Sequence, residues 1–188
     1  MILLSIDVGI RNLAYVIIEV IDINRHKILE WDVLELCDKT VKASLVDNVT
    51  IGNNMKILMN ERYNNYSFDK IIIENQIGQN AIKMKTIQGM INMYFIMNGY
   101  NNDHIINYNA VNKLKPFIEK GKKTTYSERK KLSKDITQKL CEKYYCSDIL
   151  DYYIKFKKKD DLADCLLQCL DYIKKQNLND ESFYLFIK

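Results

Sequence analysis

The hydrophobic pattern of the chain predicts five short β-strands. Residues 2–6 form an apolar run, residues 12–22 a second run rich in β-branched side chains, and residues 28–36 alternate between polar and apolar side chains. These three runs, separated only by short breaks, predict an antiparallel meander. Alternation is typical of a strand with one wet face, so the third strand is expected at an edge of the sheet. Residues 70–74 and 104–110 predict two later strands.

Helical spacing of apolar residues predicts a helix between about residues 41 and 66. Its limits are not fixed by the pattern, and Gly52 could interrupt it. A helix between the meander and the fourth strand makes a crossover, and crossovers join parallel strands of one sheet. The fourth strand should therefore lie beside the first and parallel to it. We expect an α/β fold with a mixed five-stranded sheet in the order 3-2-1-4-5 and helices on both faces.

The most apolar helix is predicted to begin at Asn80 and end at Gly99. At about 100° per residue its apolar side chains fill two adjoining sectors. One sector holds Met84, Ile87, Ile91, Tyr94 and Phe95, the other holds Ile82, Thr86, Met90, Met93 and Met97, and the polar side is defined by Lys85, Gln88, Gly89 and Asn92. One core contact cannot cover so wide an arc. We therefore expect a twofold homodimer through this helix, with burial on both sides inside the monomer as the alternative.

Two further helices are predicted in the last third of the chain. Thr125 and Glu128 have the spacing of a capping box, so a helix should begin near Tyr126 and run to about Tyr145. On this helix Arg129 and Lys130 lie over or beside the apolar stripe, whereas Lys131 points away from it. The final helix follows the acidic stretch that ends at residue 164, and the apolar end of the chain, 182–188, should dock at a place that the sequence does not indicate.

Size and composition favour a single domain over residues 1–188. A chain of 188 residues that is 47% hydrophobic can bury one good core, and one Pro with six Gly leave no room for a disordered linker. No apolar run approaches the length of a membrane span, so we expect a soluble, intracellular protein. Five cysteines without framework spacing suit a reducing compartment. Cys165 and Cys169, one turn apart, are interpreted as core residues and not as zinc ligands.

Positive charge is concentrated between Lys113 and Lys143, although the formal net charge of the chain is only +4. That stretch holds eleven basic residues against four acidic ones. A phosphate-binding surface is one interpretation, and an ordinary solvated helix face is the other.

Four acidic residues stand where carboxylates would not be expected without a function. Asp7 is a lone charge inside the first buried strand, two places before Gly9, Glu74 ends the fourth strand, and Asp161 and Asp164 share one face at the start of the last helix. Taken singly, each could be a strand end or a helix cap. Together they predict a site for two Mg²⁺ or Mn²⁺ ions, because these ions favour oxygen ligands and a pair of them promotes phosphodiester hydrolysis.

The acidic motifs, taken in order, resemble those of the RuvC-like Holliday junction resolvases of the RNase H-like superfamily, most closely the poxvirus branch. The motifs are residues 7–12, 73–76, 126–131 and 160–164, and the resemblance covers residues 2 to about 175. It implies that Asp7, Glu74, Asp161 and Asp164 bind the metal. It also implies an assisting lysine, either Lys130 or Lys131, and the helix geometry favours Lys130. The segment between Tyr145 and Lys159 is longer than the family pattern.

The same resemblance implies paired, symmetric cleavage of four-way DNA junctions in viral genome concatemer processing, and a location in the host cytoplasm. The DNA-binding residues are then expected in the basic segment, at Lys120, Lys122, Lys123, Arg129 and Lys131. A RuvC-like nuclease acting on RNA or on other branched DNA is an alternative, as is a non-catalytic junction-binding relative. The actin-like ATPases and sugar kinases share the first motif, but they need a second lobe and glycine-rich phosphate loops, which six glycines do not supply.

Overall fold

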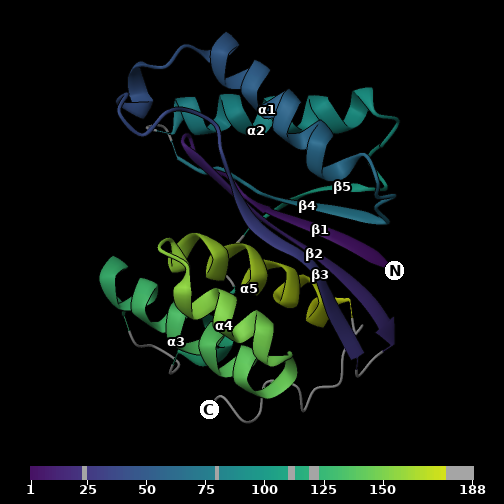
Figure 1. Cartoon of the computed structure of the whole chain (residues 1–188), viewed down its shortest axis with the longest axis vertical. Helices are drawn as coiled ribbons and strands as arrows, with labels where there is room; N and C mark the ends of the chain where they lie inside the picture. Colours follow the sequence, from purple (N-terminus) through teal and green to yellow (C-terminus); the bar gives the residue numbers. More distant parts are fainter. Residues whose placement is uncertain (23–24, 79–80, 110–112, 119–122, 177–188) are drawn as a thin grey trace.

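A computed structural model describes residues 1–22, 25–78, 81–109, 113–118 and 123–176 (Figure 1). In chain order the elements are β1 (Ile2–Asp7), β2 (Asn12–Asp22), β3 (Arg25–Glu35), the 3-10 helix η1 (Ala43–Leu45), α1 (Asn48–Tyr63), β4 (Lys70–Glu74), α2 (Ile82–Met97), β5 (Ile105–Tyr108), the 3-10 helix η3 (Lys115–Phe117), α3 (Tyr126–Tyr144), α4 (Ser147–Lys155) and α5 (Lys159–Lys175).

The five strands form one mixed sheet in the order β3-β2-β1-β4-β5, which confirms the predicted topology. β1 pairs antiparallel with β2 and parallel with β4, β2 pairs antiparallel with β3, and β4 pairs parallel with β5. The register places Ile6 opposite Ile73, so the next residues, Asp7 and Glu74, end two neighbouring strands at the same edge of the sheet.

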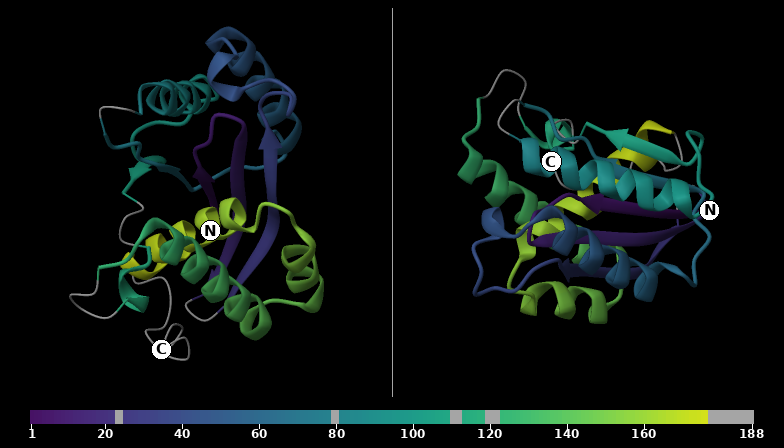
Figure 2. Two further views of the ribbon diagram at one scale, coloured as in Figure 1. Left: turned by 90° about the vertical axis from the view of Figure 1, so that its left-hand side faces the viewer. Right: turned by 90° about the horizontal axis from the view of Figure 1, so that it is seen from above.

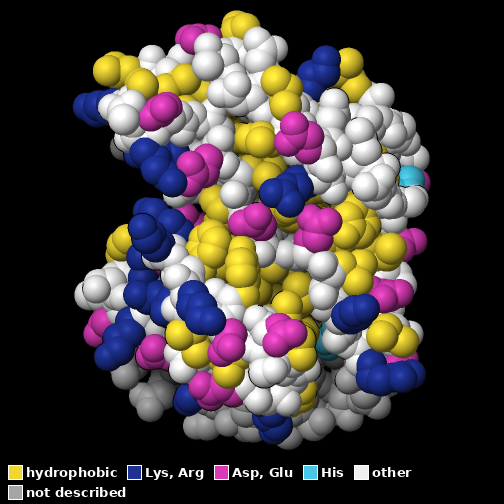
Figure 3. Space-filling model, viewed as in Figure 1, with side chains coloured by type: hydrophobic (Ala, Val, Ile, Leu, Met, Phe, Trp, Pro, Cys, Tyr) yellow, Lys and Arg dark blue, Asp and Glu magenta, His cyan; other side chains and the backbone are white. Residues whose placement is uncertain are grey.

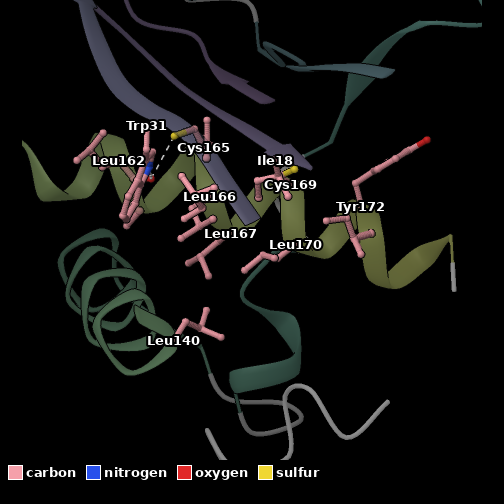
Figure 4. Close-up of a cluster of buried hydrophobic side chains, with 14 of the residues drawn as sticks. Ile18, Trp31, Leu140, Leu162, Cys165, Leu166, Leu167, Cys169, Leu170 and Tyr172 are labelled. Carbon is pink, nitrogen blue, oxygen red and sulfur yellow. Dashed lines mark hydrogen bonds between the residues drawn. The ribbon is translucent and has the colours of Figure 1, made fainter. Parts of the chain in front are cut away.

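Helices cover both faces of the sheet, with α1 and α2 on one face and α3, α4 and α5 on the other (Figures 1 and 2). Side chains alternate along β1, so Leu4 and Ile6 join the core under α1 and α2, whereas Leu3 joins the core under α5. Each such fully buried aliphatic side chain contributes about 1.5–3 kcal/mol. Figure 4 shows the α5 core, where the Trp31 indole of β3 donates to the Leu162 carbonyl at 3.0 Å.

Two helices differ from the prediction. α1 runs through Gly52 without a break. α4 lies in the segment between Tyr145 and Lys159, for which the sequence predicted no element. Its N-cap, Cys146, makes no side-chain hydrogen bond to the helix, and what anchors the helix is tertiary: the Tyr153 ring stacks on Trp31 with centroids 5.2 Å apart. A nine-residue helix depends on such packing, which the local pattern does not record.

Two other local predictions agree with the structure. The capping box of α3 is formed, with the Thr125 hydroxyl accepting from the Glu128 amide and the Glu128 carboxylate accepting from the Thr125 amide. Cys165 and Cys169 are buried core residues. No helix in the described part of the chain is both long and apolar enough to cross a membrane. The apolar end of the chain, 182–188, lies outside the described residues.

The two apolar sectors of α2 have different environments. Ile87, Ile91 and Phe95 are buried against the sheet, whereas Met93 and Met97 remain 53% and 77% exposed. Met93 and Met97 therefore point outward together with Ile82 and Ile96, a choice that the sequence left open, whereas Met90 of the same sector is partly buried and packs against the core. The placement of Gln88 on the polar side was wrong. Gln88 is buried, because its side-chain amide bonds to residues at the ends of β4 and β5. Its Oε1 accepts from the backbone N–H of Gln76 at 2.9 Å, and its Nε2 donates to Asn107 Oδ1 at 2.8 Å.

Candidate active site

Asp7 and Glu74 lie side by side because they end neighbouring parallel strands. Burial raises the pKa of Asp7 well above its ordinary value, and the negative charges of Glu74 and Asp164 raise it further. The turn after Asp7 needs a glycine, since a Cβ on Gly9 would stand 2.0 Å from the Asn12 carbonyl oxygen. This close turn starts β2 directly beside the acidic strand end.

α5 supplies the other two predicted acids at different depths. Asp164 faces the strand ends, and its Oδ1 accepts from the Ser133 hydroxyl of α3 at 3.1 Å. Asp161, one turn earlier, accepts from the Asn12 side-chain amide at 3.3 Å. Burial raises the pKa of Asp161, and so does the neighbouring Asp160 carboxylate. The structure thus brings Asp7, Glu74 and Asp164 within electrostatic reach of one another and leaves Asp161 beside the start of β2.

Lys113 lies among these acids, although the sequence did not single it out. Its side chain is only 10% exposed, and its Nζ lies 2.8 Å from Asp164 Oδ1. Burial alone would lower the pKa of Lys113, but the carboxylates of Asp164, Asp7 and Glu74 outweigh it and raise the pKa. One signal could have identified this residue. β5 is parallel to β4, so the chain just after β5 lies at the edge where Asp7 and Glu74 end.

Lys130, the lysine that helix geometry favoured, binds a different carboxylate. Its Nζ lies 2.5 Å from Asp160 Oδ2 and 5.1 Å from the centre of the Tyr126 ring. The hydrogen bond to Asp160 raises the pKa of Lys130. Asp160 is in the first turn of α5, so Lys130 stands beside the acids but bonds to none of the four that were predicted to bind metal.

The other predicted DNA contacts lie around the start of α3. Lys123, Arg129 and Lys131 are exposed, and Arg129 donates to the Thr124 carbonyl at 2.6 Å. Lys120 and Lys122 lie outside the described residues. The acidic ends of β1 and β4 point to the left in Figure 1, and the same view in Figure 3 shows a notch there between the two helical layers. Lys and Arg side chains occupy both lips of that notch, with Asp and Glu side chains next to them.

The model of the family described as "Poxvirus A22 protein" matches residues 1–177. The chain belongs to this poxvirus A22 family. No curated protein matches it in sequence.

Solved structures share the fold of this A22 family member. The fowlpox virus resolvase in complex with Holliday junction DNA is 24% identical with a TM-score of 0.61, over 94% of this chain and 99% of that one. RuvC of T. thermophilus, solved with a Holliday junction substrate, is 13% identical with a TM-score of 0.61, over 94% of this chain and 96% of that one. The yeast mitochondrial Holliday junction resolvase is 15% identical with a TM-score of 0.66, over 98% of this chain and 84% of that one. The expected RuvC-like, RNase H-like fold is therefore confirmed.

The acids of this A22 family member suit a divalent cation. Among the described residues, no three His, Cys, Asp or Glu side chains lie close enough together to hold an ion. The Lys113 ammonium lies against Asp164 instead, where it offsets only part of the charge of the three carboxylates. Carboxylate oxygens with excess negative charge are the donor set that Mg²⁺ and Mn²⁺ prefer. A cation at this edge of the sheet would relieve the repulsion that raises the pKa of Asp7.

Proposed function

We propose that this protein is a metal-dependent endonuclease that resolves four-way Holliday DNA junctions by paired, symmetric phosphodiester cleavage. The observation that carries the proposal is that Asp7, Glu74 and Asp164, from β1, β4 and α5, lie within electrostatic reach of one another in a poxvirus A22 family chain with the resolvase fold. The fowlpox virus resolvase was solved with substrate Holliday junction DNA, and T. thermophilus RuvC was solved with a Holliday junction substrate. Residues 1–188 then act as one nuclease domain in viral genome concatemer processing, in the host cytoplasm.

The residues that would hold two Mg²⁺ or Mn²⁺ ions are Asp7, Glu74, Asp161 and Asp164. Ions held there would supply the chemistry of an activated water and of a stabilised leaving oxygen in phosphodiester hydrolysis. Other residues of the chain position these acids and supply positive charge beside them. Asn12 holds Asp161 at its place in the first turn of α5. Lys113 and Lys130 provide positive charge on either side of the acids, one on Asp164 and the other on Asp160.

The basic segment then binds the phosphates of the junction arms. Lys123, Arg129 and Lys131 are exposed at the start of α3, close to the Lys130–Asp160 pair that joins α3 to α5. Such contacts position the backbone of the substrate without reading its bases. Together with Lys120 and Lys122 they make up the proposed DNA-binding set.

A substrate panel tests the function directly. We expect the protein with Mg²⁺ to cut a four-way junction at symmetric positions in two opposite strands, and to leave a linear duplex of the same sequence intact. A chelator should abolish cleavage, Mn²⁺ should restore it, and Ca²⁺ should restore binding alone. Faster cleavage of single-stranded RNA or of a simple flap than of the junction would favour the alternative nuclease activities, and metal-independent binding without any cleavage would indicate a non-catalytic relative.

Paired cutting of a junction needs two sites, and we propose that a homodimer formed through α2 supplies them. The outward sector of α2 exposes Ile82, Met93, Ile96 and Met97 on the layer opposite α3. Exposed apolar side chains gathered on one helix face are typical of an interface, and a twofold axis would place one acidic site against each of two symmetric strands.

Met93→Glu is expected to convert the protein to a monomer. A carboxylate in the interface loses its hydration without a partner, so the dimer should weaken at least about a hundredfold, roughly 2.7 kcal/mol. Sedimentation would show the monomer, and junction cleavage would give single nicks in place of paired cuts. Ile154→Glu on α4, which replaces an exposed isoleucine on the other layer, is the matched control. A wild-type protein that sediments as a monomer at micromolar concentration would contradict this prediction.

A further inference from the structure

Gln168 is a fully buried polar residue in the middle of α5, one helical turn after Asp164. Its side-chain nitrogen lies 3.1 Å from the Ile6 carbonyl oxygen and 3.2 Å from the Ile72 carbonyl oxygen. Ile6 immediately precedes Asp7, and Ile72 stands two residues before Glu74. One amide on the acid-bearing helix therefore contacts the backbone of both acid-bearing strands.

The contact closes a loop of hydrogen bonds between three elements. The Gln168 nitrogen also lies 3.1 Å from the Ser5 hydroxyl, and that hydroxyl donates to the Cys165 carbonyl of α5 at 2.9 Å. Ser5 is paired with Ile72 in the β1–β4 register. The bonds therefore run from α5 to β1 and to β4, and return from β1 to α5. On each strand the bonded residues lie within two positions of the acid, and on α5 they lie within four.

A polar side chain at this position lowers the stability of the fold, so packing alone does not explain its presence. The rest of the α5 interface with the sheet is dominated by apolar side chains, such as Leu162, Leu166 and Leu170. The Gln168 Oε1 atom is buried and has no hydrogen-bond partner in the described structure. An unsatisfied buried acceptor destabilises the fold, whereas an aliphatic side chain would fill the same space without that cost.

We propose that Gln168 is a positioning residue that sets the separation of Asp7, Glu74 and Asp164 and thereby the affinity of the site for divalent cations. The inference rests on the proposed function, because it assumes that these acids bind metal. Groups that orient metal ligands from behind change metal affinity by about 10- to 100-fold when they are removed. An aliphatic residue at 168 would keep the helix packed but release the two strand ends from the helix.

The experiment compares Gln168→Leu and Gln168→Met with wild type by calorimetric titration of Mn²⁺ and by thermal melting of the metal-free protein. Both variants are expected to bind Mn²⁺ about 10- to 100-fold more weakly while melting near the wild-type temperature. Leu170→Ala, two residues further along α5, is the control for loss of packing. It should lower the melting temperature and leave Mn²⁺ affinity within about twofold, because the aliphatic side chain of Leu170 makes no hydrogen bond to either strand.

Ser5→Ala gives a second measurement if the Gln168 variants do not fold. It removes the two hydrogen bonds of the Ser5 hydroxyl and leaves the two carbonyl contacts of Gln168, so a smaller loss of Mn²⁺ affinity is expected. Unchanged Mn²⁺ affinity in the folded Gln168 variants, or in Ser5→Ala when they do not fold, would overturn the inference and leave the proposed function standing. A wild-type protein that binds no Mn²⁺ would instead overturn the proposed function on which the inference rests.

Discussion

Asp7→Asn is expected to lower the rate of junction cleavage by about a thousandfold or more while the junction still binds. Metal ions contribute several kcal/mol to phosphodiester hydrolysis, and a loss of about 4 kcal/mol is roughly a thousandfold in rate. Asp7 is the acid on which the charges of Glu74 and Asp164 both act, so its removal affects the centre of the site. Single-turnover cleavage with Mg²⁺ measures the rate, and a mobility shift with Ca²⁺ measures binding.

Glu74→Gln, Asp161→Asn and Asp164→Asn should show the same separation between cleavage and binding. Asp171→Asn is a control on α5, because Asp171 binds Tyr108 and Lys175 and is not among the charges that act on Asp7 or Lys113. A variant among the four acids that cleaved at nearly the wild-type rate would show that its residue is not a ligand.

The raised pKa of Asp7 means that Asp7→Asn, which lowers the cleavage rate, should raise the stability of the metal-free protein. A carboxyl whose pKa is higher in the folded than in the unfolded protein binds protons more tightly when folded. Its contribution to stability is therefore lost as the pH rises from the ordinary value of 3.8 through the raised value. Asp7→Asn removes that loss, so the metal-free variant should be more stable than wild type at neutral pH. Lower activity with higher stability is typical of a site that holds mutually repelling charges.

The sheet and the proximity of Asp7 to Glu74 could be predicted because they follow from local pattern and topology. An apolar run ended by a carboxylate is visible in the sequence at Asp7 and again at Glu74. The crossover rule then places those two strand ends together without any knowledge of side-chain packing. Placing Asp164 with them depended on the order of the acidic motifs and on the family resemblance, because an aspartate in the first turns of a helix is usually a cap. Only the two strand acids follow from the residue and the direction of its own element.

The two lysines could not be assigned in this way, because their partners depend on how three elements meet. Lys113 and Lys130 belong to the same segment of eleven basic residues, which has no period that separates one cation from another. Helix geometry correctly turned Lys130 toward the body of the protein. It could not show that Asp160 would bind Lys130, or that Lys113, outside any helix, would reach Asp164. The predicted position of Gln88 was wrong for a related reason, since its hydrogen-bond partners are groups near strand ends and not on its own helix.

Lys113→Met is expected to lower the free energy of unfolding of the metal-free protein by about 3 kcal/mol at neutral pH. The substitution keeps most of the side-chain volume but removes the cation bound to Asp164, and breaking a buried ion pair leaves an uncompensated charge. The loss should shrink as the pH falls, because protonation of the carboxylates removes the repulsion. Chemical denaturation at several pH values measures it, with Lys131→Met, at an exposed lysine, as the control.

Mg²⁺ separates this explanation from a simple packing defect. If Lys113 acts as the cation of the metal-free site, added Mg²⁺ should stabilise Lys113→Met more than wild type, because the ions take over the neutralisation that the ammonium supplied. Equal stabilisation of the two proteins, or a loss in Lys113→Met that does not depend on pH, would show that Lys113 supports the fold through its hydrocarbon chain alone. Cleavage measured at saturating Mg²⁺ then reports what the ammonium contributes beyond stability, since the loaded site no longer needs it to hold the acids together.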